Sequence, residues 1–239
     1  MADRPYTVVS CGMSIDGYLD SAGATRLQLS NAADFDRVDA VRARCDAILV
    51  GAATVRNDNP RLLIRSAARR AERTAQGLPP SPVKVTLTRR GDLAPTAAFF
   101  TTGDAEKLVY CPTAASEPTR ARLHPVATVV DTGPEPDVDV ARVVEDLSAR
   151  GVNRLMVEGG GTVLTQFLTA DLVDELHLVV APLFVGDSRA PRLAGDGPFP
   201  WNADHRAALV GVRQIGDVVL LRYALSARFC AEQSPGEEG

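Results

Sequence analysis

The most informative group of chemically active residues lies where an apolar run ends on a glutamate and three glycines follow. In RLMVEGGGTVLTQFL, residues 154–168, Glu158 precedes the glycines and an apolar pattern of helical period comes after them. Glycine allows a ligand to lie directly on the backbone, and the amide groups at the start of a helix suit an anion such as phosphate. A tight strand-to-helix turn without a ligand explains the same residues, so both interpretations stay open here.

Glu158 is a candidate binding residue in its own right. A glutamate that closes an apolar strand loses hydration, and this cost is offset only if hydrogen-bond donors satisfy the carboxylate. Nearby backbone N–H groups would serve as such donors, and so would an N–H or hydroxyl group of a substrate.

The second informative stretch is GAATVRNDNPRLLIR, residues 51–65. Its first three residues are small enough to admit a flat ring or a sugar close to the backbone. Thr54 and Asp58 add a hydroxyl group and a carboxylate, and three arginines within ten residues suit a phosphate group. The alternative is a turn around the Asn-Pro pair with solvated arginines. The three arginines are Arg56, Arg61 and Arg65.

Two shorter polar stretches follow other predicted strands. In TLTRRGD, Arg89 and Arg90 come directly after a strand, where they would bind the 2′-phosphate of NADPH or form a solvated basic turn. In SIDG, Asp16 would hold a ligand hydroxyl group or cap a turn. We favour the turn, because aspartate side chains commonly bond to the backbone of their own turn.

The composition, with 45% hydrophobic and 23% charged residues in 239, is typical of a globular protein. The length favours one α/β domain, which we expect at residues 1–230, followed by a disordered tail at 231–239. A net charge of −4 argues against a nucleic-acid-binding protein, so any anion site must be a local cluster of arginines. No apolar run reaches membrane-spanning length and no signal-peptide pattern is present, so we expect a cytoplasmic protein without a membrane partner.

Cysteines and histidines are few and dispersed, and no C-x-x-C pair occurs. We therefore expect free thiols and no metal site. His177 lies in an apolar strand and is interpreted as a hydrogen-bonded core or interface residue. Trp201 lies in a loop rich in proline and glycine and is interpreted as a packing anchor. The cysteines are Cys11, Cys45, Cys111 and Cys230, and the other histidines are His124 and His205.

Short apolar runs that alternate with helical patterns predict how these residues are positioned. Helices are predicted at residues 30–45, 136–151 and 162–172. Residues 57–65 are predicted as a loop that becomes extended, and residues 66–82 as a surface excursion. Strands are predicted at residues 6–14, 46–55, 83–88, 106–111, 127–131, 152–158 and 173–186, with a hairpin at 206–225.

This alternation predicts an α/β fold with a mostly parallel central sheet, flanked by helices, and a C-terminal antiparallel hairpin. Ligands bind beyond the carboxyl ends of the strands in such a sheet. Polar or small residues follow four of the predicted strands, which indicates one shared cleft. These residues are Ser14 and Asp16, residues 54–58, residues 88–90, and Glu158 with its glycines.

Four segments, CGMSIDGYL, GAATVRNDNPRLLIR, VEGGGTVLTQFL and VDELHLVVAPLFVG, together resemble the riboflavin-biosynthesis pyrimidine reductase family. The resemblance covers about residues 5–225 and implies a fold like that of dihydrofolate reductase. It also implies NADPH-dependent reduction of a ribosylaminopyrimidine 5′-phosphate to the ribitylamino form, as in a 5-amino-6-(5-phosphoribosylamino)uracil reductase. Hydride would pass from the nicotinamide to C1′ of the opened sugar imine.

The same resemblance assigns roles to individual residues. It places a substrate site at Arg42, Leu62, Arg65 and Glu158, with the arginines on the 5′-phosphate. Asp58 is the candidate catalytic residue, as proton donor or relay, and water is the alternative donor. The implied cofactor-binding residues are Gly12, Thr54, Asp58, Thr88, Arg89, Gly160, Gly161, Thr162, Val163, Leu164 and Gln166.

The chain also departs from the family pattern. Ser10 stands where many members carry lysine or asparagine, which puts the contacts to the substrate ring in doubt. The deaminase patterns H-x-E and P-C-x-x-C are absent, so a stand-alone reductase is expected, acting before or after deamination. A reductase of the same fold for another substrate such as a dihydropterin, or a non-catalytic nucleotide-binding module, remains the alternative. The apolar strand after residue 174 and the closing hairpin predict a homodimer.

Overall fold

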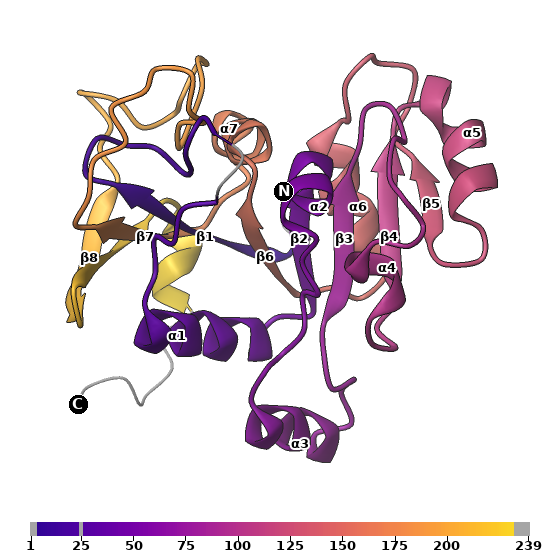
Figure 1. The fold of residues 1–239 in the computed structure, drawn as a ribbon, viewed down its shortest axis with the longest axis horizontal. Coiled ribbons are helices and arrows are strands. Elements are labelled where there is room, and N and C mark those ends of the chain that lie inside the picture. Colours follow the sequence, from indigo (N-terminus) through magenta and orange to yellow (C-terminus); the bar gives the residue numbers. More distant parts are fainter. Residues whose placement is uncertain (1–3, 24–25, 232–239) are drawn as a thin grey trace.

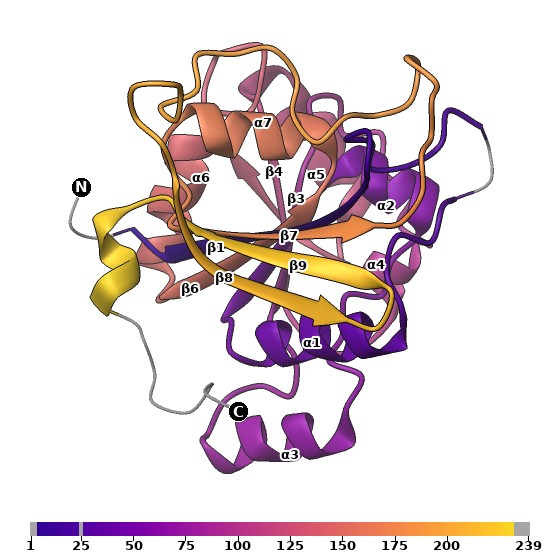
Figure 2. The same cartoon turned by 90° about the vertical axis from the view of Figure 1, so that its left-hand side faces the viewer.

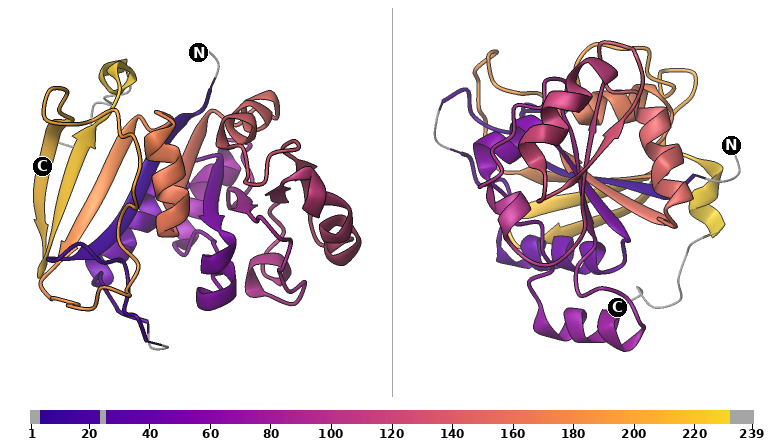
Figure 3. Two further views of the ribbon diagram at one scale, coloured as in Figure 1. Left: turned by 90° about the horizontal axis from the view of Figure 1, so that it is seen from above. Right: turned by 90° about the vertical axis from the view of Figure 1, so that its right-hand side faces the viewer.

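The computed structural model describes residues 4–23 and 26–231 and contains one twisted sheet with helices on both faces (Figure 1 and Figure 3). Its strands are β1 (Tyr6–Ser14), β2 (Ala47–Gly51), β3 (Val83–Leu87), β4 (Lys107–Cys111), β5 (Thr128–Asp131), β6 (Arg154–Gly159), β7 (Glu175–Ala181), β8 (Ala208–Ile215) and β9 (Val218–Ala224). Its helices are α1 (Ala32–Ala43), α2 (Ala52–Asp58), α3 (Ala67–Ala75), α4 (Ala98–Thr101), α5 (Thr113–Leu123), α6 (Val140–Ala149), α7 (Gly161–Thr169) and the 3₁₀ helix η1 (Ala227–Ala231).

The strand order is β5-β4-β3-β2-β6-β1-β7-β9-β8. Strands from β5 to β7 pair in parallel, and β9 pairs antiparallel with both β7 and β8. The mostly parallel sheet and the terminal hairpin predicted from the sequence are therefore confirmed. All five residues of β2 are buried, as expected of a parallel strand covered on both faces.

The two faces of the sheet are covered by different helices. Apolar side chains of α6 and α7, such as Leu147 and Phe167, form the core on one face. Val55 of α2, Phe99 of α4 and Leu123 of α5 pack on the other face. At the β7–β9 end, α7 and α1 lie on opposite sides of the sheet (Figure 2).

Most predicted elements are confirmed, with ends that shift by a few residues. Asn31 caps α1 by accepting a hydrogen bond from the backbone N–H of Asp34 at 3.0 Å. Gly216 turns the terminal hairpin with a φ of +62°. No helix within the described part of the chain is long and apolar enough to cross a membrane.

Two predicted strands were too long, and several helices had not been predicted. The strand predicted through residues 46–55 ends at Gly51, because α2 begins at the next residue. The strand predicted through residue 186 ends at Ala181, because Pro182 has no N–H group for the ladder. The surface excursion at 66–82 contains α3, and α4 and α5 had no predicted counterpart. Of the predicted tail, only Ala231 is described, at the end of η1.

Candidate active site

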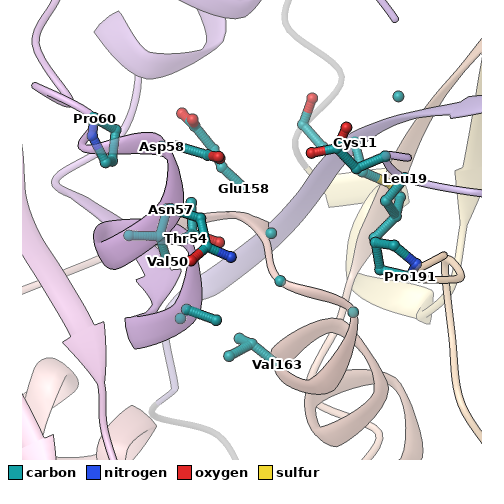
Figure 4. A pocket seen from close by; sticks show the side chains of 18 of the residues that line it. Cys11, Leu19, Val50, Thr54, Asn57, Asp58, Pro60, Glu158, Val163 and Pro191 are labelled. Atoms are coloured by element: carbon teal, nitrogen blue, oxygen red, sulfur yellow. The ribbon is translucent and has the colours of Figure 1, made fainter. Parts of the chain in front are cut away.

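A cavity of about 1820 Å³ opens at the carboxyl ends of β1, β2 and β6. Figure 4 shows Thr54, Asn57 and Asp58 of α2 on one side of it and Cys11 on the other, with Glu158 between them. Three of the four predicted strand ends contribute to this cavity, so the shared cleft is confirmed except for the end that carries Ser14 and Asp16. The predicted site residues that line it are Gly12, Arg42, Thr54, Asp58, Leu62, Arg65, Arg89, Glu158, Gly160, Gly161, Thr162, Val163 and Gln166.

Two residues predicted to bind the cofactor, Thr88 and Leu164, do not line the cavity. Thr88 is 2% exposed and its hydroxyl oxygen accepts a hydrogen bond from the backbone N–H of Gly91 at 3.0 Å. The side chain of Leu164 is fully buried in the core, and its N–H donates to the carbonyl of Gly160 at 3.0 Å. Both residues therefore lie buried behind the wall of the cavity, where they support it.

The polar turn after β1 is structural, as its residues indicated. Asp16 accepts hydrogen bonds from the hydroxyl group of Ser14 and from the N–H groups of Val185 and Gly186. Burial opposes the charge on this carboxyl group, but these hydrogen bonds hold its pKa at about 2. Neither Ser14 nor Asp16 lines the cavity, so the turn interpretation is confirmed.

Each of the three glycines between β6 and α7 has a separate physical reason. Gly159 and Gly160 adopt φ values of +143° and +88°, which a residue with a Cβ atom rarely adopts. A Cβ atom on Gly161 would lie 2.6 Å from the carbonyl oxygen of Arg192. The strand-to-helix turn therefore requires all three glycines before any ligand is considered.

The same glycines leave the start of α7 open toward the cavity. Gly160 is the N-cap and no side chain caps the helix, while Leu164 is the residue whose N–H bonds back to Gly160. The amides of Gly161, Thr162 and Val163 precede that bond, and all three residues line the cavity. Amide groups at a helix start attract an anion, so this wall suits a phosphate or diphosphate.

Glu158 is satisfied by Arg42 of α1. The guanidinium group of Arg42 donates to both carboxylate oxygens of Glu158, from Nε and Nη2, at 2.5 Å each. The side chains are 13% and 12% exposed, so the pair is largely desolvated and geometrically fixed. Burial lowers the pKa of Arg42, but the Glu158 carboxylate more than offsets this effect and raises it. Two predicted substrate residues thus act as one unit.

The loop at residues 61–65 is held against α1 and α3 by its backbone. The carboxylate of Asp39 accepts the N–H groups of Arg65 and Ser66, at 2.5 and 3.1 Å. Arg70 donates to the carbonyls of Ile64 and Arg65, at 2.8 and 2.7 Å. Leu62 is buried with a φ of +46°, a backbone strain that the surrounding contacts must maintain. The loop is therefore a preorganised wall of the cavity.

Arg61 and Arg65 are left available by this arrangement. Both are exposed and line the cavity, and neither forms an ion pair with another described residue. The guanidinium carbon of Arg65 lies 5.1 Å from the centre of the Phe35 ring. Two guanidinium groups without carboxylate partners at the mouth of a cavity suit a phosphate group.

Asp58 is a largely buried carboxylate at the wall of the cavity. Its side chain is 17% exposed and its carboxylate lies 3.2 Å from the guanidinium group of Arg26. Burial raises the pKa of Asp58, Arg26 opposes this effect, and the Asp20 carboxylate adds to it. The net direction is upward, which suits a group that holds or passes on a proton.

Arg89 lines the main cavity and, with Arg90, a smaller hollow of about 490 Å³. Arg89 is paired weakly with Asp137 at 3.5 Å, and both side chains are more than half exposed. An anion could displace so solvated a partner at little cost. The structure is consistent with either a phosphate-binding or a solvated role for these arginines.

Sequence reasoning missed several residues that line the cavity. Asp20, Asp34, Arg37 and Arg192 come from the loop after β1, from α1 and from the loop after β7. Their sequence context was that of ordinary surface charges, so it carried no signal of the cavity. His177 and Trp201 are as interpreted: the His177 ring bonds to Glu175 at 2.7 Å, and Trp201 Nε1 donates to the Leu225 carbonyl.

With the geometry established, the chain was compared with known proteins. The sequence profile of the RibD C-terminal domain matches residues 5–221. A relative from Archaeoglobus fulgidus, named 2,5-diamino-6-ribosylamino-4(3H)-pyrimidinone 5′-phosphate reductase, is 33% identical over 95% of this chain and 99% of its own length. A relative of the same name from Methanothermobacter thermautotrophicus is 34% identical over 93% of this chain and 99% of its own.

The fold also matches a solved structure. Acinetobacter baumannii RibD superimposes with a TM-score of 0.74 at 25% sequence identity. The match covers 93% of this chain and 58% of the Acinetobacter chain, so the present chain corresponds to part of that protein. The predicted family and fold class are thus confirmed.

Proposed function

The chain belongs to the family of the RibD C-terminal domain, and on this premise we propose NADPH-dependent reduction of a ribosylaminopyrimidine 5′-phosphate as its reaction. The protein is an oxidoreductase of riboflavin biosynthesis that acts on a ribosylaminopyrimidine phosphate and uses a nicotinamide cofactor. NADPH as the specific cofactor is our proposal. Arg89 supports this choice of cofactor, because a weakly paired cation at the cavity wall suits the 2′-phosphate of NADPH.

One observation supports the proposal above all others: two different anion-binding walls face one cavity. The start of α7 offers backbone amides, and the loop at residues 61–65 offers the guanidinium groups of Arg61 and Arg65. A reductase of this kind must hold two phosphorylated molecules together, one on each wall. The Glu158–Arg42 pair lies in the same cavity, where the two ligands would meet.

The residues at the first wall fit a dinucleotide. A Cβ atom on Gly160 would lie in ordinary contact with its surroundings, 3.4 Å from the Thr54 hydroxyl oxygen, but the φ of +88° disfavours any residue other than glycine there. The amides of Gly161 and Thr162 would hold a diphosphate, and Thr54 would contact the remainder of the cofactor. A bound nicotinamide cofactor supplies the hydride.

The protein's own residues position the substrate and manage the proton. Arg61 and Arg65 bind the 5′-phosphate, which fixes the ribose in the cavity. Glu158 accepts a hydrogen bond from the substrate while the two hydrogen bonds from Arg42 hold its carboxylate in place. Asp58 holds or relays the proton that the substrate nitrogen gains, because it lines the cavity and burial raises the pKa of its carboxyl group.

We further propose the diamino compound, before deamination, as the substrate. The two relatives that match this chain over 99% of their length both carry that substrate in their names. The proposal is tested by following absorbance at 340 nm with NADPH and each of the two ribosylaminopyrimidine phosphates. Turnover of the diamino compound is expected. Turnover of only the deaminated compound would refute the substrate, and turnover of neither, with activity on dihydropterins, would refute the function.

We also propose a cytoplasmic homodimer that forms through the β8–β9 end of the sheet. Large apolar side chains are exposed there, including Leu209 at 54% and Val212 at 62%. Val219 of β9 pairs with Gln214 of β8. Gln214 is two residues from Val212 on the same strand, so Val219 and Val212 lie on the same face of the sheet. Exposed apolar patches of this kind mark association surfaces. Sedimentation showing a monomer at micromolar concentration would remove the dimer.

A further inference from the structure

A row of polar side chains crosses the sheet beneath α1. Ser10 of β1 is in register with His177 of β7, and His177 with Arg222 of β9, so the three side chains share one face. Ser10 and the α1 residue Arg37 line the active-site cavity.

The hydroxyl group of Ser10 is largely buried at the edge of the cavity. The residue is only 5% exposed, yet its hydroxyl group forms no hydrogen bond with any described residue. The hydroxyl oxygen is not completely enclosed by protein atoms. A buried hydroxyl group without a partner is costly unless a ligand or water supplies the missing bond. Because Ser10 lines the cavity, that bond is available from the cavity side.

Arg37 brings a guanidinium group to the same place. Its Nε donates to Asp34 at 2.6 Å and its Nη1 lies 3.2 Å from Nδ1 of His177. The His177 Nε2 lies 2.7 Å from Glu175, whose carboxylate accepts bonds from Arg222 at 2.7 and 2.9 Å.

This chain of contacts fixes both the imidazole and the guanidinium group. Burial lowers the pKa of His177 even though Glu175 opposes the shift. The neutral ring then accepts from Arg37 through Nδ1 and donates to Glu175 through Nε2. The side chain of Arg37 is 9% exposed, and its Nη2 group has no partner among the described residues.

The charge balance of this corner distinguishes it from the arginine loop. The charge of Arg37 is already neutralised by Asp34, whose side chain is 1% exposed. The corner therefore offers hydrogen-bond donors without net charge, whereas Arg61 and Arg65 offer unpaired charge at the mouth. A neutral oxygen suits the corner better than a phosphate does.

We propose that the Ser10 hydroxyl group and Arg37 Nη2 together bind the ring carbonyl oxygen of the substrate pyrimidinone, so that Arg37 is a specificity-determining residue. His177 is a positioning residue that holds Arg37 over Ser10. This inference rests on the proposed function, since it names the contact that the pyrimidine ring makes in the same cavity.

The sharpest test is Ser10→Ala, because removal of an unpartnered hydroxyl group disturbs no contact within the protein. We expect KM for the ribosylaminopyrimidine phosphate to rise about fivefold, as for the loss of one hydrogen bond, with NADPH affinity within about twofold of wild type. Arg37→Lys keeps the ion pair with Asp34 but removes the second N–H donor, Nη2. We expect it to raise KM about tenfold.

Two further measurements separate recognition from a structural role. In the double variant, the effects should not multiply, because both groups bind the same oxygen. Ser116→Ala removes a buried hydroxyl group in α5, outside the cavity, and should leave KM unchanged. If wild type turns over its substrate and both Ser10→Ala and Arg37→Lys keep the wild-type KM, the inference is wrong while the proposed function stands. If wild type has no turnover, both are wrong.

Discussion

The two walls of the cavity that we propose to bind anions are built in different ways. At the start of α7 the proposed binding groups are backbone amides, where the positive φ of Gly160 disfavours a side chain and a Cβ atom on Gly161 would lie 2.6 Å from the carbonyl oxygen of Arg192. At the loop of residues 61–65 the proposed binding groups are side chains, and the backbone is held by Asp39 and Arg70. The first wall is marked by the residue types of one short stretch, whereas the second depends on side-chain contacts between distant segments.

This difference gives the two walls different sensitivities to mutation. A backbone wall fails when a Cβ atom is added, and its failure affects the ligand that lies on the amides. A side-chain wall fails when a guanidinium group is removed or when its support is lost. Substitutions can therefore damage one wall at a time, and each should affect one ligand far more than the other.

The largest expected effect is on the support between the walls. Arg42→Met leaves the Glu158 carboxylate desolvated without its partner, which typically costs about 3–5 kcal/mol of stability. Urea unfolding monitored by circular dichroism measures this loss. Met is close to Arg in length, so packing is largely kept. The double variant Arg42→Met/Glu158→Met should recover much of the stability, and a single variant as stable as wild type would show that the pair is not buried in solution.

The next effect is on the backbone wall. Gly160→Val places a β-branched residue at a φ of +88° and fills the space between Thr54 and Gly51, so NADPH affinity should fall at least about 100-fold. Fluorescence titration measures the affinity. Gly151→Val is the matched control, since Gly151 has a φ of +84° and nothing within 4 Å of its Cβ position. Equal NADPH affinity in both variants would contradict the role of this wall.

A substitution in the side-chain wall should weaken binding of the substrate and leave binding of NADPH almost unchanged. Arg65→Ala removes one charged partner of the substrate phosphate, and KM for the substrate should rise about 10- to 100-fold with little change in NADPH affinity. Arg56→Ala is the control, because Arg56 lies in the same stretch but pairs with Asp92 at 2.8 Å outside the cavity. Equal losses for both ligands in Arg65→Ala would mean that the two sites are assigned wrongly.

The smallest effect concerns Asp58, which lies on α2 at the edge of the cavity. Its pKa is raised in the folded protein, so the native state binds this proton more tightly than the unfolded chain does. The contribution of Asp58 to stability is therefore present below the ordinary aspartate pKa and is lost as pH rises through the raised value. Asp58→Asn should become more stable relative to wild type between pH 4 and pH 7, as measured by urea unfolding. A difference that shrinks over this range would reverse the assignment.

The contrast between the walls also explains how much the sequence revealed. The glycines at residues 159–161 indicate the first wall, because backbone with a positive φ or a close neighbour requires glycine, and glycine is visible in the sequence. The mostly parallel sheet was predictable for a similar reason, since buried strands are short apolar runs. Local rules of this kind operate within a few residues.

The second wall was only partly predictable. Arg42 and Glu158 are 116 residues apart, so no local pattern indicates that they pair. Asp39 has the sequence context of a surface helix acid, although it binds the backbone of residues 65 and 66.

α2 was missed because Gly51 and two alanines have the composition of a strand exit as well as that of a helix start. The positive φ of Leu62 likewise results from tertiary contacts.

In the proposed function, the two walls hold two phosphorylated ligands at the same time. A fluorescence titration of NADPH in the absence and in the presence of saturating ribose 5-phosphate tests this directly. We expect NADPH to bind in both cases with dissociation constants that agree within about twofold. Displacement of NADPH by ribose 5-phosphate, or no NADPH binding at all, would contradict it.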